Sequence, residues 1–222
     1  MARAGSYGRE DFDRAGRELK ASLGGAESRR YAPLDAIYRH AAGGVLYCGN
    51  VEAARSRPAL AEANVTFVVN CTREHALFFE GRGIEYLRFP IADWWKGSRG
   101  RRRGAESLLA FFEPLFDFVI GALRAGANVM VHCLAGAHRA GTASCALLMR
   151  LTGCDMTTAV WAAQQRRSII SPIGSFTDLL RNLDEALTSS GLRARAIEEL
   201  APAGPPADGD RRSPGDGAHA TL

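Results

Sequence analysis

The stretch VHCLAGAHRAGTAS, residues 131–144, joins an apolar strand to a helix through a loop of small residues. The strand runs into Cys133, the loop has Gly136 near its middle, and Arg139 begins a series of good helix formers. A strand-to-helix loop of this kind aims consecutive backbone N–H groups at its centre, and the helix N-terminus adds partial positive charge. The stretch therefore predicts a nest for a dianionic phosphate.

The same loop favours a negatively charged sulfur at Cys133. Backbone amides and the helix dipole stabilise a thiolate, which is the nucleophilic form of cysteine. The guanidinium of Arg139 is a planar fork that binds two phosphate oxygens at once and follows the charge during transfer. We therefore predict that Cys133 and Arg139 are catalytic. The predicted phosphate-binding residues are those of the loop: Leu134, Ala135, Gly136, Ala137, His138 and Arg139.

Runs typical of strands and of helices alternate along the chain on both sides of the loop. Short runs rich in β-branched or aromatic residues predict strands at 45–50, 66–71, 85–90 and 128–133. Helices are expected at 51–63, 113–124, 140–151, 157–167 and 176–187. Residues 105–112 are expected to form a separate turn of helix, because Pro114 suits a first turn better than a helix interior. This alternation predicts an α/β domain whose sheet has helices on both faces.

His-Cys, five residues and Arg, with Gly three places after the Cys, resembles the signature of the protein tyrosine and dual-specificity phosphatases. The resemblance extends over about 40–188, because GGVLYCGNVEAA, VTFVVNCT and RRSIISPIGSFTDLLRNLDE are similar to that family's opening strand and helix, second strand and closing segment. It implies a central, mostly parallel sheet of about five strands with the phosphate loop at its carboxyl edge. It also implies hydrolysis of phosphotyrosine and phosphoserine/threonine in proteins through a cysteinyl-phosphate, without metal or organic cofactor.

The leaving oxygen of such a substrate has to be protonated, so a positioned carboxylic acid is required. In the family this acid follows the third strand on a mobile loop and later activates the attacking water. Asp93 fits that place, since it directly follows FPIA and precedes the cysteine by 40 positions. Trp94 and Trp95 beside it could cover the pocket, while Asp117 and Glu113 are poorer candidates because they fall within a helical pattern. The alternative for Asp93 is that it only caps a turn.

The chain departs from the family pattern immediately after the signature arginine. Many members have Ser or Thr there, whose hydroxyl stabilises the departing thiolate, whereas this chain has Ala140. Thr142 is not assumed to replace that hydroxyl, so we expect slow hydrolysis of the intermediate. Two alternatives stay open: a phosphatase for a phosphoinositide, a glucan or an RNA 5′-phosphate, or a slow module that mainly binds phosphorylated partners.

His138 either strengthens anion binding as an imidazolium or faces solvent.

Two further features each have two interpretations. The segment from Lys96 to Arg103 has five cations in eight residues, which either steer anionic substrates to the pocket or form a solvated loop. It lacks interleaved aromatic residues, so a nucleic-acid partner is not favoured. Cys71 ends the second expected strand and is either a packed core thiol or a partner for an oxidative disulfide with Cys133.

Composition limits the remaining possibilities. The 222 residues suit one catalytic domain, expected over 31–190, with an N-terminal extension (1–30) and a largely disordered tail (191–222). The extension should contain a short helix, since apolar residues recur at helical spacing from Phe12 to Leu23. The five cysteines show no pairing pattern, which predicts a reduced compartment, the cytoplasm or the nucleus. No apolar run reaches about 18 residues, so no membrane anchor is expected. The N-terminal residues lack the pattern of a secretory signal or a transit peptide. The expected partner is a phosphorylated protein, and no residue pattern indicates an oligomeric state.

Overall fold

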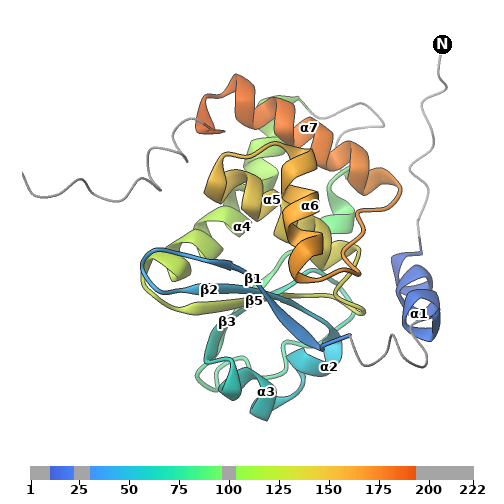
Figure 1. Ribbon diagram of the computed structural model, residues 1–222, viewed down its shortest axis with the longest axis vertical. Helices are drawn as coiled ribbons and strands as arrows, with labels where there is room; N and C mark the ends of the chain where they lie inside the picture. The colour runs from blue at the N-terminus through green and yellow to red at the C-terminus, as the bar shows by residue number, and fades with distance from the viewer. Residues whose placement is uncertain (1–10, 23–30, 97–103, 194–222) are drawn as a thin grey trace, which may run out of the picture.

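The computed structural model describes residues 11–22, 31–96 and 104–193. Its centre is a five-stranded sheet in the order β1-β2-β5-β3-β4 (Figure 1). β1 pairs antiparallel with β2, and the other neighbouring strands are parallel. The predicted α/β class with a mostly parallel sheet is therefore confirmed. The strands are β1 Leu34–Arg39, β2 Val45–Gly49, β3 Val65–Asn70, β4 Glu85–Arg88 and β5 Asn128–His132.

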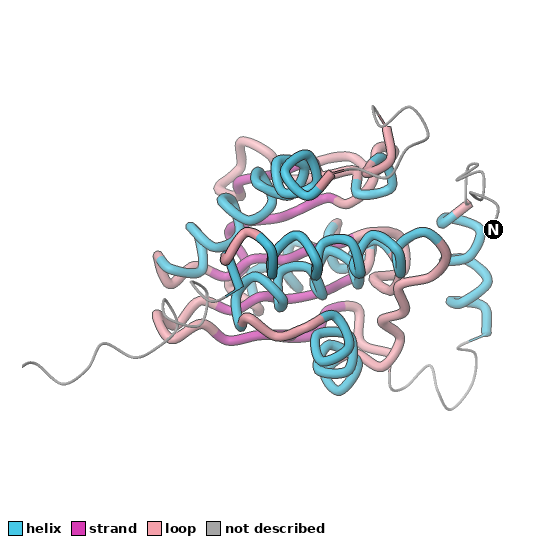
Figure 2. The backbone as a smooth tube through the Cα atoms, turned by 90° about the horizontal axis from the view of Figure 1, so that it is seen from above, coloured by secondary structure: helices cyan, strands magenta, loops and turns pink. Residues whose placement is uncertain are grey.

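Helices cover both faces of the sheet, as the alternating pattern predicted. Figure 1 shows α4, α5, α6 and α7 on one face and α2 and α3 on the other. The helices are α1 Phe12–Ser22, α2 Val51–Ala54, α3 Arg57–Glu62, α4 Ala105–Arg124, α5 Arg139–Thr152, α6 Met156–Arg166 and α7 Ser175–Ser189, with a 3-10 helix, η2, at Ile91–Asp93. Viewed from above, α1 lies beyond one end of the strands (Figure 2).

The central strand β5 is buried on both faces, which explains its continuous apolar sequence. Val129, Met130 and Val131 have no exposed surface, and Met130 packs on the α2–α3 side while the two valines face the larger core. Helix α5 follows β5 directly and is buried along most of its length. Its small residues allow this, since a Cβ added at Gly141 would lie 3.0 Å from Ile170. The predicted phosphate loop is therefore held between two deeply buried elements.

Three local expectations were wrong or incomplete. The helix expected at 51–63 is two helices, because Ser56 caps the start of α3 by accepting a hydrogen bond from the amide of Ala59 at 3.3 Å. Residues 105–112 are not a separate turn: α4 continues through Pro114, since Phe112 and Leu115 on either side are fully buried in the core. Strand β1 was missed, because it is half-buried and polar residues interrupt its apolar pattern.

The helix expected near the start of the chain is α1. The catalytic-domain limits at 31 and 190 stay predictions, and most of the expected tail, 194–222, lies outside the described residues. Of the helices in the described ranges, none has the length and apolarity needed to cross a bilayer.

Candidate active site

The predicted phosphate loop lies between β5 and α5, at the carboxyl edge of the sheet. β5 ends at His132, Cys133 follows at once, and α5 begins at Arg139. Cys133 is 2% exposed and Arg139 is 5% exposed. Both predicted catalytic residues are thus placed in one loop that is largely shielded from solvent. Open α/β sheets bind ligands at this edge.

Each carbonyl from Leu134 to His138 accepts a hydrogen bond from outside the loop. The donors are the amide of Val51 (3.2 Å), the hydroxyl of Tyr31 (2.7 Å), Nε of Arg167 (2.8 Å), the amide of Ser171 (3.2 Å) and the amide of Thr142 (2.8 Å), in that order. In a trans peptide the C=O and the next N–H point in opposite directions, so the amides of residues 135–139 are turned toward the loop's centre. The amide of Gly136 donates to Sγ of Cys133 at 3.3 Å. This is the arrangement that stabilises a thiolate or a bound oxyanion.

Glycine is required at position 136 for two reasons. Its φ is +68°, in the left-handed region that side chains disfavour. A Cβ there would also lie 2.5 Å from the carbonyl oxygen of Gly49 and 2.8 Å from Arg167. The curvature of the loop therefore depends on this residue.

Arg167 holds the loop from behind and was not singled out from the sequence. Its Nε and Nη2 donate to the carbonyls of Gly136 and Ala135, at 2.8 and 3.1 Å. Its Nη1 donates to Asp35 at 2.5 Å, and the guanidinium lies 5.0 Å from the ring centre of Tyr31. Arg167 is 3% exposed whereas its neighbour in the chain, Arg166, is exposed. The chain has two consecutive arginines here, in RRS, and the sequence does not indicate which of them is buried.

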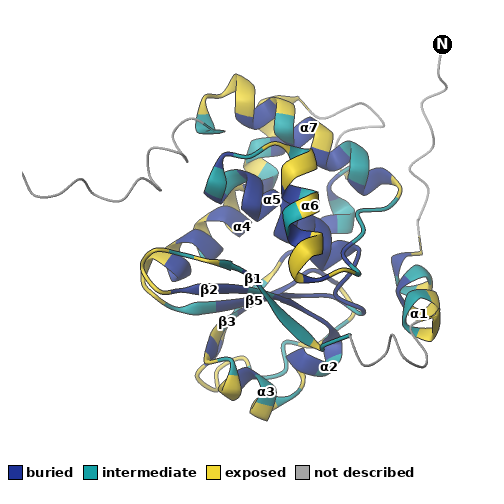
Figure 3. Cartoon of the chain, in the orientation of Figure 1, coloured by how far each residue is buried: buried dark blue, intermediate teal, exposed yellow. Residues whose placement is uncertain are grey.

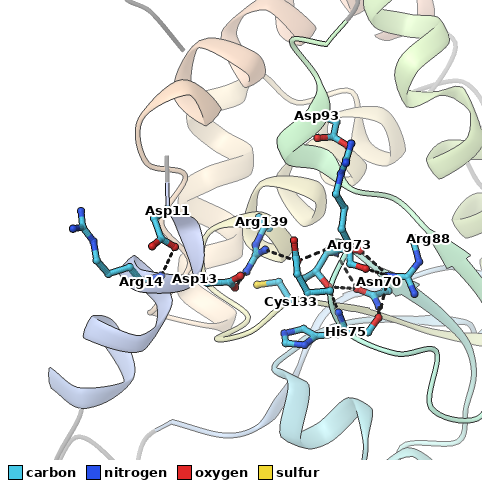
Figure 4. A network of polar contacts seen from close by, with 12 residues as sticks. Asp11, Asp13, Arg14, Asn70, Arg73, His75, Arg88, Asp93, Cys133 and Arg139 are labelled. Atoms are coloured by element: carbon cyan, nitrogen blue, oxygen red, sulfur yellow. Dashed lines mark hydrogen bonds and ion pairs between the residues drawn. The ribbon is translucent and has the colours of Figure 1, made fainter. Parts of the chain in front are cut away.

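The guanidinium of Arg139 is paired with two carboxylates (Figure 4). Asp13 of α1 forms an ion pair with Nη2, and Oε2 of Glu74 lies 3.8 Å from Nη1. Burial works against the charged form of Arg139, but attraction by Cys133 and Asp13 outweighs it and raises its pKa. Arg139 therefore stays cationic at any physiological pH. Neither carboxylate was expected at the site.

Asp93, the predicted acid, is at the end of η2 and lines the same cavity as Arg139. The cavity has a volume of about 780 Å³. One Asp93 oxygen accepts a hydrogen bond from Nε of Arg73 at 2.6 Å, and the other lies 2.8 Å from Nζ of Lys96. The structure thus brings the predicted acid to the cavity but holds it between two cations.

The two tryptophans beside Asp93 differ in their surroundings. Trp95 lines the cavity, as expected of a residue that covers the pocket. Trp94 is 3% exposed and packs in the larger core. Its expected role as a pocket cover was therefore wrong, because its ring turns into the helical layer.

The segment after β3 presents Arg73 and Glu74 to the cavity. Asn70 fixes it by accepting from the amide and hydroxyl of Thr72, at 2.9 and 2.8 Å, and by donating to the carbonyl of His75 at 2.9 Å. Arg88 of β4 donates to the same carbonyl at 3.0 Å (Figure 4). This segment was not identified from the sequence, since its charges read as an ordinary surface loop.

The two histidines of the signature are not placed to transfer protons. Burial, with a contribution from His75, lowers the pKa of His132 to about 3, so its ring is neutral. Among the described residues neither ring nitrogen of His132 has a hydrogen-bond partner of good geometry, although the backbone of Cys133 is near enough to act weakly in the opposite direction on its pKa. Nδ1 of His138 is 2.8 Å from the carbonyl of Ser171 and donates to it, because a carbonyl only accepts. His138 is therefore neither solvent-facing nor a lining residue of the cavity.

Other polar and thiol groups near the loop serve packing. Ala140 is fully buried, and the hydroxyl of Thr142 donates to the carbonyl of His138 at 2.7 Å, so it does not replace the missing hydroxyl. Cys71 is a buried free thiol whose pKa is raised by burial, which agrees with a core role.

Of the cation-rich segment only Lys96 belongs to the described residues. Within the described ranges no group of three His, Cys, Asp or Glu side chains could hold a metal ion.

Comparisons with known proteins agree with this geometry. A family profile described as the dual specificity phosphatase catalytic domain matches residues 46–186. Human dual specificity phosphatase 28 is 32% identical over 142 residues, which are 64% of this chain and 75% of the relative. Human dual specificity protein phosphatase 9 is 29% identical over 143 residues, 64% of this chain and 35% of the relative. The chain thus spans about a third of the length of several matched relatives.

Solved structures show the same fold. The crystal structure of human DUSP28 superposes with a TM-score of 0.57 at 29% identity, over 71% of this chain and 96% of that chain. PTPMT1 in complex with PI(5)P superposes with a TM-score of 0.54 at 20% identity, over 72% of this chain and 99% of that chain. The second likeness bears on the fold alone.

Proposed function

This chain belongs to the dual-specificity phosphatases, and from that premise we propose that it hydrolyses phosphate monoesters on proteins through a phosphate bound transiently to Cys133. The proposed substrates are phosphotyrosine and phosphoserine or phosphothreonine. The observation that carries the proposal is the loop itself. Its carbonyls are all engaged outside, the amide of Gly136 donates to the sulfur, and Arg139 begins the helix beside it.

In the first step the thiolate of Cys133 attacks phosphorus. An S–P bond forms and the ester P–O bond breaks, while Asp93 gives its proton to the leaving oxygen. Arg139 and the loop amides neutralise the three oxygens of the transferred group, so positioning and electrostatics supply most of the rate. Both oxygens of Asp93 are paired in the described conformation, so at least one pair, to Arg73 or to Lys96, has to break before it acts.

In the second step water attacks the cysteinyl-phosphate. The carboxylate of Asp93 takes a proton from this water, the S–P bond breaks, and Cys133 leaves as a thiolate with release of inorganic phosphate. The hydroxyl that many relatives place after the signature arginine is missing, because residue 140 is alanine, and the hydroxyl of Thr142 donates to the carbonyl of His138 instead. We therefore expect the second step to limit turnover.

The test is turnover of p-nitrophenyl phosphate and of phosphotyrosine and phosphoserine peptides by the purified chain. Cys133→Ser is the control, since the serine hydroxyl is a far weaker nucleophile at neutral pH. The proposal predicts an acid-stable phosphoprotein in the wild type that is absent from the variant. Equal turnover by both proteins would exclude covalent catalysis at Cys133. Faster release of phosphate from a phosphoinositide headgroup than from either peptide would replace the protein substrate by a lipid one.

A second candidate function is a slow module that captures phosphorylated partners. It is favoured by one observation, the absence of a free hydroxyl after Arg139. This candidate predicts tight binding of phosphopeptides with wild-type turnover no greater than that of Cys133→Ser. Turnover that greatly exceeds the variant's would exclude it.

A further inference from the structure

Helix α1 lies against the predicted phosphate loop although the two are far apart in the chain. One face of the helix holds it there. Residues 12, 16 and 20 recur four places apart, which places them on the same side. Phe12 and Gly16 are buried and Lys20 is half-buried, whereas Arg14 and Glu18 are exposed. Figure 3 shows this division, with the buried positions of α1 turned to the body of the protein.

Three contacts attach this face. The ring of Phe12 stacks on that of Phe176, with centroids 4.3 Å apart and an interplanar angle of 18°. Gly16 lies directly over the loop, since a Cβ there would be 3.5 Å from the side chain of Leu134. Nζ of Lys20 is 2.6 Å from Oε1 of Glu52. The helix thus spans the loop from the α7 side to the α2 side.

Asp13 lies between the first two of these contacts and pairs with Arg139 (Figure 4). The side chain of Arg139 is 7% exposed, so its guanidinium is screened from solvent by the groups around it. A carboxylate presents two oxygens in one plane to the fork of an arginine, as two oxygens of a phosphate do. Through Oδ1, Asp13 therefore occupies Nη2, one of the guanidinium nitrogens that a substrate phosphate would need.

The charge of Asp13 argues against a role in holding substrate. A carboxylate beside the phosphate site repels a dianionic phosphate, and the repulsion is strong where solvent is excluded. Oε2 of Glu74 adds a second negative charge 3.8 Å from the same guanidinium. The described arrangement favours an empty, self-paired site over an occupied one.

We infer, on the basis of the proposed phosphate site, that α1 is an autoinhibitory segment in which Asp13 competes with substrate phosphate for Arg139. Release of α1 from the loop opens the site. Its docking is suited to release, because an isolated helix of 11 residues is marginal in water and Phe12 is its only large buried apolar side chain. Being part of the same chain, Asp13 competes at a high effective concentration without a strong contact.

The test compares Asp13→Asn with Glu18→Gln in the full chain. Both remove one carboxylate from α1, but Glu18 lies on the outward face and contacts Arg14 at 3.7 Å instead of the loop. Two readouts are measured: kcat/KM for p-nitrophenyl phosphate, and the Kd of tungstate, a tetrahedral oxyanion that needs no turnover. Asp13→Asn should raise kcat/KM and tighten tungstate binding about tenfold, the effect of one charge-assisted hydrogen bond. Glu18→Gln should change neither by more than about twofold.

Phe12→Ala undocks α1 by a different route and should, like Asp13→Asn, raise kcat/KM and lower the Kd of tungstate, with a lower KM. Tungstate binding and kcat/KM that are unchanged or weaker in Asp13→Asn would overturn the inference. Failure of the proposed function gives a different pattern. In that case Cys133→Ser matches the wild type in turnover, while tungstate affinity still decides whether Asp13 occupies the site.

Discussion

Replacing Arg167 by methionine removes the side chain that supports the catalytic loop while keeping most of its apolar stem. The wild-type guanidinium bridges the carbonyls of Gly136 and Ala135 and pairs with Asp35. Methionine makes none of these bonds. In the variant the carbonyl of Ala135 keeps its hydrogen bond from the hydroxyl of Tyr31, whereas that of Gly136 keeps only the weak thiol donor Cys48 at 3.6 Å.

The size of the effect follows from burial. Breaking a buried ion pair by removing one partner costs about 3–5 kcal/mol, and the partly exposed Asp35 places this pair at the lower end. The carbonyl of Gly136, which loses Nε of Arg167 as its donor, adds about 1–3 kcal/mol to this cost. We expect a loss of about 4 kcal/mol in the free energy of unfolding and a fall of roughly 10 °C in Tm. Turnover should fall about a hundredfold, because loop amides misplaced by about 1 Å no longer fit the transferred phosphate.

Urea unfolding followed by circular dichroism, together with p-nitrophenyl phosphate turnover, measures both effects. Arg166→Met is the matched control, since it removes the neighbouring charge from an exposed position. Arg167→Lys should recover the pair with Asp35 but little of the turnover, because an ammonium lacks the fork that spans two carbonyls. Equal stability and turnover in Arg167→Met and Arg166→Met would refute the positioning role.

Three other outcomes are expected. Gly136→Ala should lower turnover by more than about a hundredfold, because the added Cβ meets the carbonyl of Gly49 at a disfavoured φ; wild-type kinetics would contradict this requirement. Asp93→Asn should slow an aryl phosphate with a basic leaving group about a hundredfold and one with an acidic leaving group far less, and equal slowing of both would remove Asp93 from the acid role. Ala140→Ser should lower the steady-state amount of cysteinyl-phosphate, as seen by acid quench, and an unchanged amount would show that the second step does not depend on this hydroxyl.

The chemistry of the loop could be predicted from the sequence because its parts are adjacent in the chain. A strand, a run of small residues with Gly136, and a helix beginning at Arg139 form a nest by local geometry, and the α/β class follows from the alternation around it. Asp93 could be placed near the loop by the resemblance, and the structure brings it to the same cavity as Arg139.

Only the tertiary structure decided what surrounds that loop. Asp13 and Arg139 are 126 positions apart, and Arg167 and Gly136 are 31 apart. Local periodicity carries no information about which distant charges meet, so neither pair has a sequence signal of its own. The continuity of α4 through Pro114 has the same cause, since packing of its flanking residues in the core outweighs the local preference against proline. The sequence by itself therefore determined the strand, loop and helix that form the predicted phosphate site, whereas folding decided which of the chain's own charges lie beside it.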